Sequence, residues 1–324
     1  MTDASVLRRA PVDYDASRAL ADRVLDNLRQ VMHAPEETLR LTVLCLLAEG
    51  HLIIEDFPGV GKTTLAKSLA RSVGCSFSRI QFTPDLLPSD VTGVNVFNQL
   101  TNVFEFRPGP VFANLLLVDE INRASPKTQA ALLECMQEQQ VTVDGVSYAL
   151  APPFMVLATQ NPIEYEGTYP LPEAELDRFT LKVSIGYPPL AEEARMLAEQ
   201  TREEPLDALQ PVASAEQILA AIAAARDVYV EESLNAYVVQ LLRASRADPR
   251  VYLGASPRSG IALLRVAKAR ALVEGRDHVQ PEDVKAIAAP VLAHRLILAP
   301  EARASGLEPA GLVGELLDRT PVPA

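Results

Sequence analysis

The chain has 324 residues, of which 48% are hydrophobic, so it is long enough to bury a sizeable core and too apolar to be disordered. Its formal net charge of −12 gives an acidic field, which disfavours non-specific nucleic-acid binding and leaves room only for a local basic groove. The cysteines, Cys45, Cys75 and Cys135, are too far apart for a disulfide framework or a metal-ligand spacing, so buried thiols in a reducing compartment are expected.

The N-terminal segment, residues 1–15, has no apolar core of the kind that a signal peptide needs, and we expect it to be flexible. Residues 16–48 show helical apolar periodicity and predict the first helices. The longest apolar stretch of the chain is interrupted by Glu49 and His51, so we expect no helix that crosses a membrane. These features favour a cytoplasmic protein.

Residues 51–64 have the pattern of an apolar strand, a glycine-containing loop and a helix start. The glycines let the backbone turn and direct N–H groups inward, Lys62 supplies a cation for the β- and γ-phosphates, and the Thr63 hydroxyl can bind Mg²⁺. The loop would lie at a helix N-terminus, where anions are favoured. The pattern predicts a nucleotide site formed by Pro58, Gly59, Val60, Gly61, Lys62, Thr63 and Thr64.

One position departs from the phosphate-loop pattern, because Asp56 stands where the motif begins with glycine. A carboxylate that pointed at the triphosphate would repel it. Glycine serves mainly backbone geometry here, and aspartate tolerates turn conformations. We therefore expect the Asp56 side chain to point away from the loop and nucleotide binding to survive.

Short apolar runs alternate with helical patterns through the first half of the chain, which predicts a parallel sheet with helices on both faces. An irregular aromatic segment at 94–107 indicates an insertion carrying short strands, and residues 141–148 predict a hairpin with Asp144-Gly145 as its turn. The predicted sheet strands are 51–55, 76–82, 114–119, 154–159 and 181–185.

After Pro188-Pro189 the sequence becomes helical and rich in alanine and leucine. This change predicts an α/β nucleotide-binding domain over 16–188 and a smaller helical domain over 189–324, which ends in a C-terminal tail. The helices predicted in the second domain are 190–203, 214–227, 231–246, 258–274 and 281–297.

A fully apolar strand at 115–118 is followed by two carboxylates, Asp119 and Glu120. A strand that is buried on both faces cannot keep carboxylates inside it, so they should emerge at the carboxyl edge of the sheet, where ligands bind. Asp119 can hold the Mg²⁺ shell and Glu120 can polarise an attacking water, whereas the simpler interpretation is a helix-capping acidic pair. Arg123 could hold Glu120 or face a neighbouring molecule.

Three further polar residues are open to two interpretations. Asn161 follows a buried strand, where its amide could orient water, although Asn-Pro is more often only a turn. Arg178 lies just before a strand, and on this pattern alone it is a surface residue. Arg258 lies in the first turn of a helix that Ser256 could cap, and alone it would be a solvated side chain.

Taken together, these segments resemble the MoxR-type ATPases of the AAA+ superfamily. The resemblance implies an AAA+ P-loop module, in which helices sandwich a parallel five-stranded sheet, followed by a smaller C-terminal all-helical lid. It also implies ATP hydrolysis with Mg²⁺. The resembling segments lie in order over about residues 30–295 and are FPGVGKTTLAKSLA, FRPGPVFANLLLVDEINRASPKTQAALLECMQE, ATQNPIEYEGTYPLPEAELDRF, and GASPRSGIALLRVAKARAL with VQPEDV.

The resemblance also assigns roles to the polar residues. Asn161 matches the first sensor, Arg178 the arginine finger that reaches a neighbouring subunit's γ-phosphate, and Arg258 the second sensor, in its own subunit or the next. An arginine supplied in trans makes hydrolysis depend on assembly, so we expect a homo-oligomeric ring, most simply a hexamer. Lys62 and Thr63 match the Walker A residues, and Asp119 and Glu120 match the Walker B residues.

The resemblance implies a motor that remodels or activates partner proteins, with metalloenzyme maturation and a partner bearing a von Willebrand A domain as the family pattern. The alternatives are a nucleic-acid translocase, a chelatase-type metal-insertion motor and a non-hydrolysing scaffold. The predicted hairpin at 141–148 has no Lys or Arg to follow a phosphate backbone, which disfavours the translocase. The intact Asp119-Glu120 pair disfavours the scaffold.

Overall fold

The computed structural model describes residues 13–161, 168–187, 193 and 205–322. Most of the N-terminal segment and of the predicted helix at 190–203 therefore lies outside the described residues. The first two helices are α1 (Tyr14–Arg29) and α2 (Glu36–Leu47), as the periodicity predicted.

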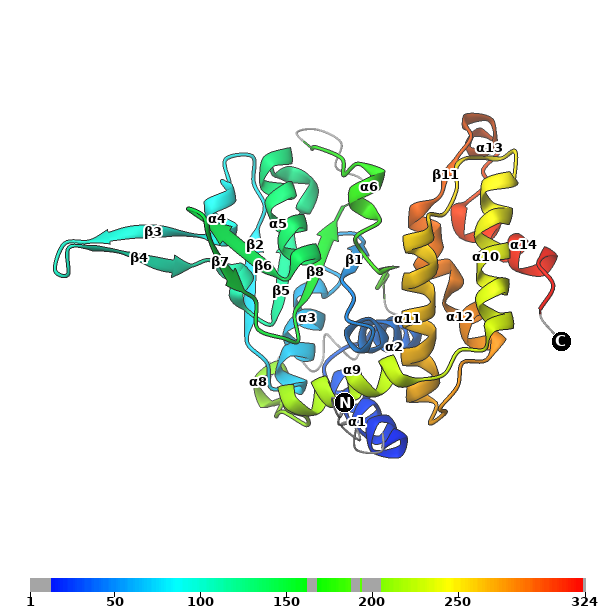
Figure 1. The fold of residues 1–324 in the computed structure, drawn as a ribbon, viewed down its shortest axis with the longest axis horizontal. Helices are drawn as coiled ribbons and strands as arrows, with labels where there is room; N and C mark the ends of the chain where they lie inside the picture. Colours follow the sequence, from blue (N-terminus) through cyan, green and yellow to red (C-terminus); the bar gives the residue numbers. More distant parts are fainter. Residues whose placement is uncertain (1–12, 162–167, 188–192, 194–204, 323–324) are drawn as a thin grey trace, which may run out of the picture.

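The centre of the fold is a parallel five-stranded sheet with the strand order β2-β5-β8-β1-β9 (Figure 1). All five predicted strands are confirmed to within one or two residues at each end. Because the strands are parallel, the carboxyl ends of β1, β5 and β8 meet at one edge of the sheet. The strands are β1 (Leu52–Glu55), β2 (Phe77–Gln81), β5 (Leu115–Asp119), β8 (Met155–Gln160) and β9 (Leu181–Val183).

Both faces of this sheet are buried, as the continuous apolar runs predicted. Alternate side chains enter different cores: Leu52 and Ile54 pack with α1, α2 and α3 (Lys62–Ser72), whereas Ile53 packs on the opposite face. That second face is covered by α4 (Pro88–Thr92) and α5 (Pro126–Glu138). The sheet is thus sandwiched by helices, which confirms the predicted fold class.

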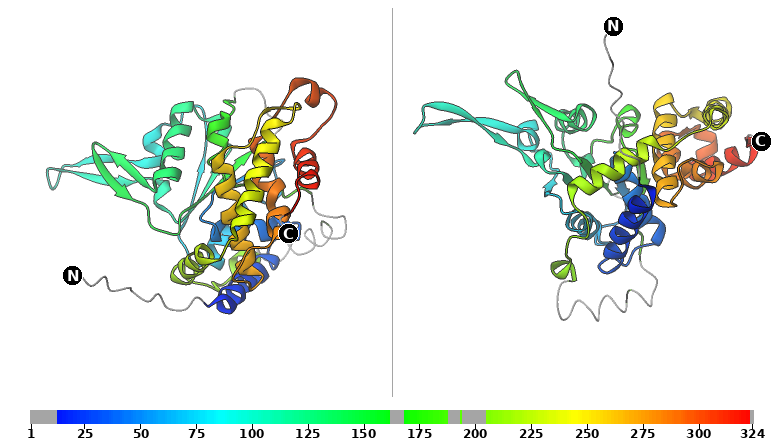
Figure 2. Two further views of the ribbon diagram at one scale, coloured as in Figure 1. Left: turned by 45° about the vertical axis from the view of Figure 1, so that its right-hand side comes forward. Right: turned by 60° about the horizontal axis from the view of Figure 1, so that its bottom comes forward.

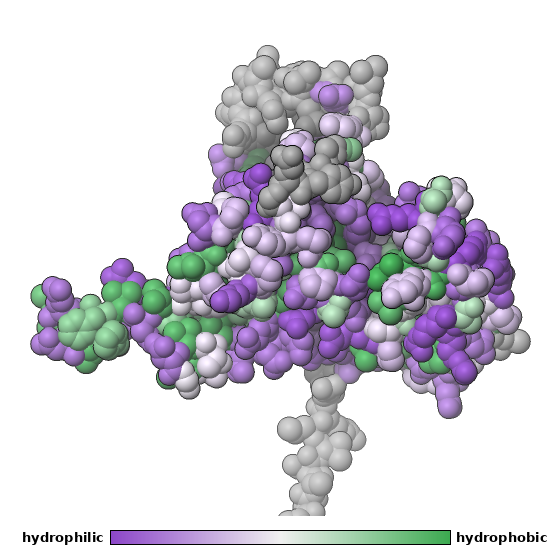
Figure 3. Space-filling model, turned by 90° about the horizontal axis from the view of Figure 1, so that it is seen from above, coloured by the Kyte–Doolittle hydropathy of each residue, from purple (hydrophilic) through white to green (hydrophobic). Residues whose placement is uncertain are grey.

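Two hairpins project from the sheet domain (Figures 1 and 2). The insertion is β3 (Gly93–Asn98) with β4 (Val103–Pro108), and the predicted second hairpin is β6 (Gln140–Val143) with β7 (Val146–Ala149). Rings of Phe106 and Tyr148 stack between the two hairpins at 4.1 Å. The far end of the insertion shows exposed apolar side chains in Figure 3, namely Phe97, Leu100, Val103 and Phe104.

The C-terminal part is predominantly helical, as expected, with one addition. The predicted helix at 281–297 ends at Leu292, because 293–295 form a 3₁₀ turn and β11 (Ile297–Leu298) pairs antiparallel with β10 (Val251–Leu253). The described helices that follow β8 are α6 (Glu173–Leu176), α8 (Pro205–Ala208), α9 (Ala215–Asp227), α10 (Glu232–Ala247), α11 (Pro257–Val273), α12 (Pro281–Leu292), α13 (Pro300–Ala304) and α14 (Pro309–Arg319), of which α6 precedes the last sheet strand, β9.

The helical part is joined to the sheet domain by apolar packing. Helix α11 (Figure 1) contacts α1, α2 and α9. One hydrophobic cluster therefore continues from the sheet into the lid. Within the described part of the chain, no helix has the length and apolar character needed to span a membrane. Short 3₁₀ turns complete the described elements: η1 (Pro110–Phe112), η2 (Ile121–Arg123) and η3 (Ala293–Arg295).

Candidate functional site

The loop between β1 and α3 has the backbone geometry that phosphate binding requires. Gly59 and Gly61 have φ of 85° and 94°, in the left-handed region that glycine adopts without strain. Lys62 opens α3, and its Nζ donates to the backbone oxygen of Asp56, which holds the ammonium over the loop. An anion bound here would meet the N–H groups and the positive end of the helix.

A cavity at the carboxyl edge of the sheet brings the loop together with the polar residues that follow β5 and β8. The predicted residues Asp119, Glu120 and Asn161 line it, whereas Val60 packs instead against the hydrophobic core. Three lining residues were not singled out from the sequence: Arg79, Gln81 and Thr159. The complete lining is Pro58, Gly59, Gly61, Lys62, Thr63, Thr64, Arg79, Gln81, Asp119, Glu120, Thr159 and Asn161.

The Asp56 side chain points away from this cavity, as expected. One carboxylate oxygen accepts hydrogen bonds from Ser184 Oγ at 2.9 Å and from the backbone N–H groups of Ile185 and Gly186 at 2.6 Å each. Burial alone would raise the pKa of Asp56, but these bonds and one from Phe57 outweigh it and lower the pKa. The aspartate therefore ties the start of the loop to the segment after β9.

Asp119 ends a fully buried strand and is 8% exposed. Its carboxylate accepts from Arg79 Nε at 2.6 Å and from Thr159 Oγ1 at 3.3 Å. Asp119 and the Thr63 hydroxyl line the same cavity and offer the hard oxygen ligands that Mg²⁺ prefers, so the donor set fits this metal. Arg79 and Gln81 are two residues apart on β2, so the sequence places both on one face of that strand. It does not show that β2 lies beside β5, which is what brings Arg79 to Asp119.

Glu120 follows Asp119 in a left-handed conformation, with φ of 55°. Its backbone N–H donates to Thr159 Oγ1 at 3.0 Å, and its carboxylate is held by Arg123 Nη1 at 3.0 Å. The structure therefore shows that Arg123 holds Glu120, which is the first of the two roles considered for it. The uncommon backbone geometry directs Glu120 into the cavity beside Asp119.

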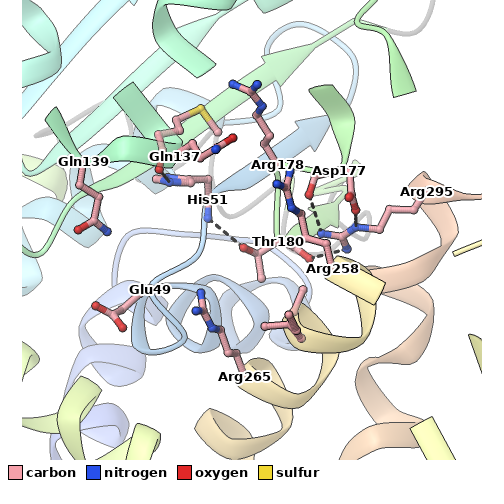
Figure 4. A pocket seen from close by; sticks show the side chains of 13 residues that line it. Glu49, His51, Gln137, Gln139, Asp177, Arg178, Thr180, Arg258, Arg265 and Arg295 are labelled. Carbon is pink, nitrogen blue, oxygen red and sulfur yellow. Dashed lines mark hydrogen bonds and ion pairs between the residues drawn. The ribbon is translucent and has the colours of Figure 1, made fainter. Parts of the chain in front are cut away.

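Arg178 and Arg258 do not lie at this cavity. They line a second one, which we call the arginine pocket, together with Arg265 and Arg295 (Figure 4). Arg265 follows Arg258 by two helical turns on α11, a spacing that places both on one helix face. The remaining lining residues are Glu49, His51, Met136, Gln137, Gln139, Asp177, Thr180, Ile261 and Ala262.

The arginine pocket lies at the opposite edge of the sheet from the phosphate loop. His51 immediately precedes β1 and Thr180 immediately precedes β9, and the N–H of Thr180 donates to the His51 oxygen at 2.8 Å. The phosphate loop follows β1, whose four residues span about 13 Å. The two linings share no residue, so the structure separates Arg178 and Arg258 from their own phosphate loop.

His51 forms the buried floor of the arginine pocket. Its Nδ1 accepts from the Val156 N–H at 3.0 Å, and its Nε2 lies 3.1 Å from the Met136 oxygen. These partners require a neutral ring with its proton on Nε2. Burial lowers the pKa of His51 to about 4, so the ring is neutral at physiological pH.

A phosphate loop, two carboxylates at the end of a buried strand and a helical lid define the class of ATP-binding AAA modules. Residues 51–181 match the family described as "ATPase family associated with various cellular activities (AAA)", and residues 243–315 match the "AAA lid domain".

Relatives of similar length narrow this class. Over 304 residues, 94% of this chain and 95% of the relative, the chain is 47% identical to "Uncharacterized protein YeaC" of Bacillus subtilis. It is 40% identical over 311 residues to "Chaperone MoxR1" of Mycobacterium tuberculosis, covering 93% of this chain and 82% of that protein. "Protein MoxR" of Paracoccus denitrificans is 32% identical over 96% of both chains. The chain belongs to the MoxR family of AAA ATPases.

Solved structures agree with this assignment. An ATPase structure from Cytophaga hutchinsonii has a TM-score of 0.90 and 38% identity, covering 96% of this chain and 97% of that one. An MCM homologue from Methanopyrus kandleri, at 20% identity and a TM-score of 0.58, covers 90% of this chain and 63% of its own, and shows a shared fold only.

Proposed function

We propose that the protein is an ATP-hydrolysing motor that works in the cytoplasm as a ring of identical subunits, most simply a hexamer, and remodels partner proteins. The observation that carries this proposal is the separation of the predicted site residues into two cavities at opposite edges of one sheet. In a subunit of this shape the phosphate-loop cavity contains neither Arg178 nor Arg258, and the arginine pocket contains no residue of the phosphate loop.

In the first half-site, the loop N–H groups and Lys62 bind the phosphates, and Thr63 and Asp119 hold Mg²⁺. Bound Mg²⁺ would neutralise charge on the β- and γ-phosphates. Glu120 accepts a proton from water as it attacks the γ-phosphorus, and Asn161 orients that water. The ion pair with Arg123 orients the Glu120 carboxylate.

In the second half-site, Arg178 and Arg258 meet the γ-phosphate of the neighbouring subunit. Both arginines line one cavity, which supports the assignment of Arg258 to the same neighbour as Arg178. Charge that develops on the transferred phosphoryl group is then stabilised only when two subunits are in contact. Hydrolysis is thereby tied to assembly of the ring.

Work on proteins is supported by the name of the relative "Chaperone MoxR1". The β6–β7 hairpin has no Lys or Arg among its residues, which gives it no means of following a phosphate backbone. We include in the proposal a von Willebrand A domain partner and a role in maturing metalloenzymes, following the family pattern.

Mixing two inactive variants tests the shared site. Lys62→Ala removes phosphate binding and Arg178→Ala removes the trans arginine, so each homomeric ring should hydrolyse ATP at a small fraction of the parent rate. In mixed rings, an intact loop of an Arg178→Ala subunit can meet the intact Arg178 of its neighbour, and turnover should return. Mixtures that stay inactive, although native mass spectrometry shows mixed rings, would refute the trans site.

Glu120→Gln, which should bind ATP without turnover, tests the client class. Affinity capture with this variant and ATP should retain proteins, and capture with Lys62→Ala is the matched control for non-specific retention. Nucleic acid retained by Glu120→Gln alone, without protein, would instead support the translocase.

A further inference from the structure

Asp177 precedes Arg178 in the chain, yet its carboxylate is engaged by other groups. Oδ1 accepts from Arg295 Nε at 2.7 Å, and Oδ2 accepts from Ser256 Oγ at 3.1 Å. Ser259 Oγ lies 3.4 Å from Oδ1. The carboxylate therefore contacts two parts of the lid, the start of α11 and the η3 turn that follows α12. Figure 4 shows the contact with Arg295.

Arg295, in the η3 turn after α12, makes this contact rigid. The Arg295 side chain is 2% exposed, and it also donates to the backbone oxygens of Phe179 at 2.6 Å and Thr180 at 3.2 Å. A buried guanidinium needs a compensating charge, and Asp177 supplies it. Arg295 thus holds residues 177–180, including Arg178, against the lid.

The partners on α11 connect the same carboxylate to Arg258. Ser256 is the N-cap of α11 and Ser259 is the third residue of the helix, so Arg258 lies between two residues that contact Asp177. A shift of the carboxylate would move the first turn of α11 and Arg258 with it. Helix α11 continues for 17 residues and packs on the helices of the sheet domain.

Among the described residues, the ion-pair partner of this carboxylate is Arg295 and not Arg178, whose buried Nε has no hydrogen-bond partner there. The negative charge of Asp177 is directed at Arg295 and the serine hydroxyls. An aspartate beside an arginine would normally pair with it and weaken its attraction for a phosphate. Here the geometry directs the charge elsewhere.

We propose that Asp177 is a positioning residue that locks Arg178 of the sheet domain and Arg258 of the lid into one unit, aimed at the neighbouring subunit's nucleotide. The proposal rests on the trans site described above. It adds that the two arginines keep their spacing because one carboxylate holds both of the segments that carry them. A displacement of about 1 Å in the position of such an arginine can lower the rate of hydrolysis by about 10²-fold.

Asp177→Asn tests the lock, with Asp283→Asn as its matched control. Asp283 is a buried lid carboxylate held by Arg276 at 2.6 Å and Arg270 at 3.3 Å. Within the described residues, neither Arg178 nor Arg258 is among its ion-pair partners. We expect Asp177→Asn to lower kcat by about 10²-fold while the affinity for an ATP analogue stays at the parent value. Asp283→Asn should lower Tm comparably and leave kcat nearly unchanged.

Complementation separates positioning from general damage. Lys62→Ala subunits carry an intact arginine pocket, so mixing them with Asp177→Asn subunits should restore turnover at the shared sites.

A second pair of variants covers the case in which Asp177→Asn does not fold. Ser256→Gly removes one hydroxyl that contacts the Asp177 carboxylate, and Ser214→Gly makes the same change at the N-cap of α9. Glycine at an N-cap costs only a few tenths of a kcal/mol, so both should fold, and only Ser256→Gly should lower kcat.

The inference is overturned if Asp177→Asn and Asp283→Asn have the same kcat, or if Ser256→Gly and Ser214→Gly do. Failure of the proposed function has a different signature. In that case Arg178→Ala itself keeps the parent turnover, whatever the Asp177 variants do.

Discussion

The two cavities of this protein are built in different ways. The phosphate-loop cavity takes its residues from the loop and helix start after β1 and from the neighbouring parallel strands β2, β5 and β8, which the sheet edge brings together. The arginine pocket is assembled from the turn before β1, the segment before β9, the end of α5 and the lid. The sheet domain alone forms the phosphate-loop cavity, whereas the arginine pocket forms only when the lid packs on the sheet domain.

This difference predicts how each cavity responds to change. Substitutions at the phosphate loop should alter nucleotide affinity within one subunit. Substitutions at the arginine pocket should alter the rate and leave affinity intact, because its arginines act on another subunit's nucleotide. Four experiments probe the two cavities and the contacts that hold them, in order of decreasing expected effect.

The largest effect is expected for Arg178→Ala, since a trans arginine can contribute about 10³-fold or more to kcat. Turnover should fall by at least that factor, and equilibrium titration with a fluorescent ATP analogue should give the parent affinity. Lys62→Ala is the contrasting variant, because it should lose the analogue. An Arg178→Ala protein that binds the analogue weakly would remove the distinction between the two cavities.

Asp56→Gly should destabilise the protein without improving nucleotide binding. The substitution restores the motif glycine but removes a buried carboxylate that accepts from Ser184, Ile185 and Gly186, at a cost of about 2–3 kcal/mol in unfolding free energy. Denaturant unfolding and analogue titration measure the two quantities. A large gain in affinity would mean that the carboxylate does oppose the phosphates.

Acidification should lower the free energy of unfolding through His51, which lies at the arginine pocket. Its folded pKa of about 4 lies below the ordinary value, so the unfolded chain takes up the proton first as the pH falls. Stability from this group is full above about pH 6.5 and declines toward pH 4, by about 2 kcal/mol between pH 6.5 and 5. Thermal unfolding should show this slope, and His51→Gln, which can still accept and donate, should flatten it.

The smallest effect is expected at Arg79. Its guanidinium pairs with Asp119, the proposed Mg²⁺ ligand, so metal binding must compete with this ion pair. Arg79 is half exposed, and such pairs contribute about 0.2–1 kcal/mol, so Arg79→Gln should lower the half-saturating Mg²⁺ concentration for analogue binding by up to about fivefold. An unchanged half-saturating Mg²⁺ concentration would show that the ion pair of Arg79 with Asp119 does not oppose metal binding.

Much of the phosphate-loop cavity could be predicted because its determinants are local. Glycines at 59 and 61, the apolar run before Asp119 and the lysine at 62 each have one physical interpretation. Arg79 and Thr159 were missed because their roles depend on which strands are neighbours. The prediction placed the end of α12 at residue 297, but the helix ends at Leu292 because β11 pairs with β10.

The amino-acid sequence alone determines four features, because periodicity and motif spacing act over a few residues. They are the parallel sheet, the helical lid, the phosphate loop and the carboxylates at the end of β5. The separation of Arg178 and Arg258 from their own loop follows only from the fold. So do the contacts of Asp177 with Arg295 and Ser256, which lie 118 and 79 residues further along the chain. Packing of the lid on the sheet domain brings such distant residues together, and no short-range pattern encodes that packing.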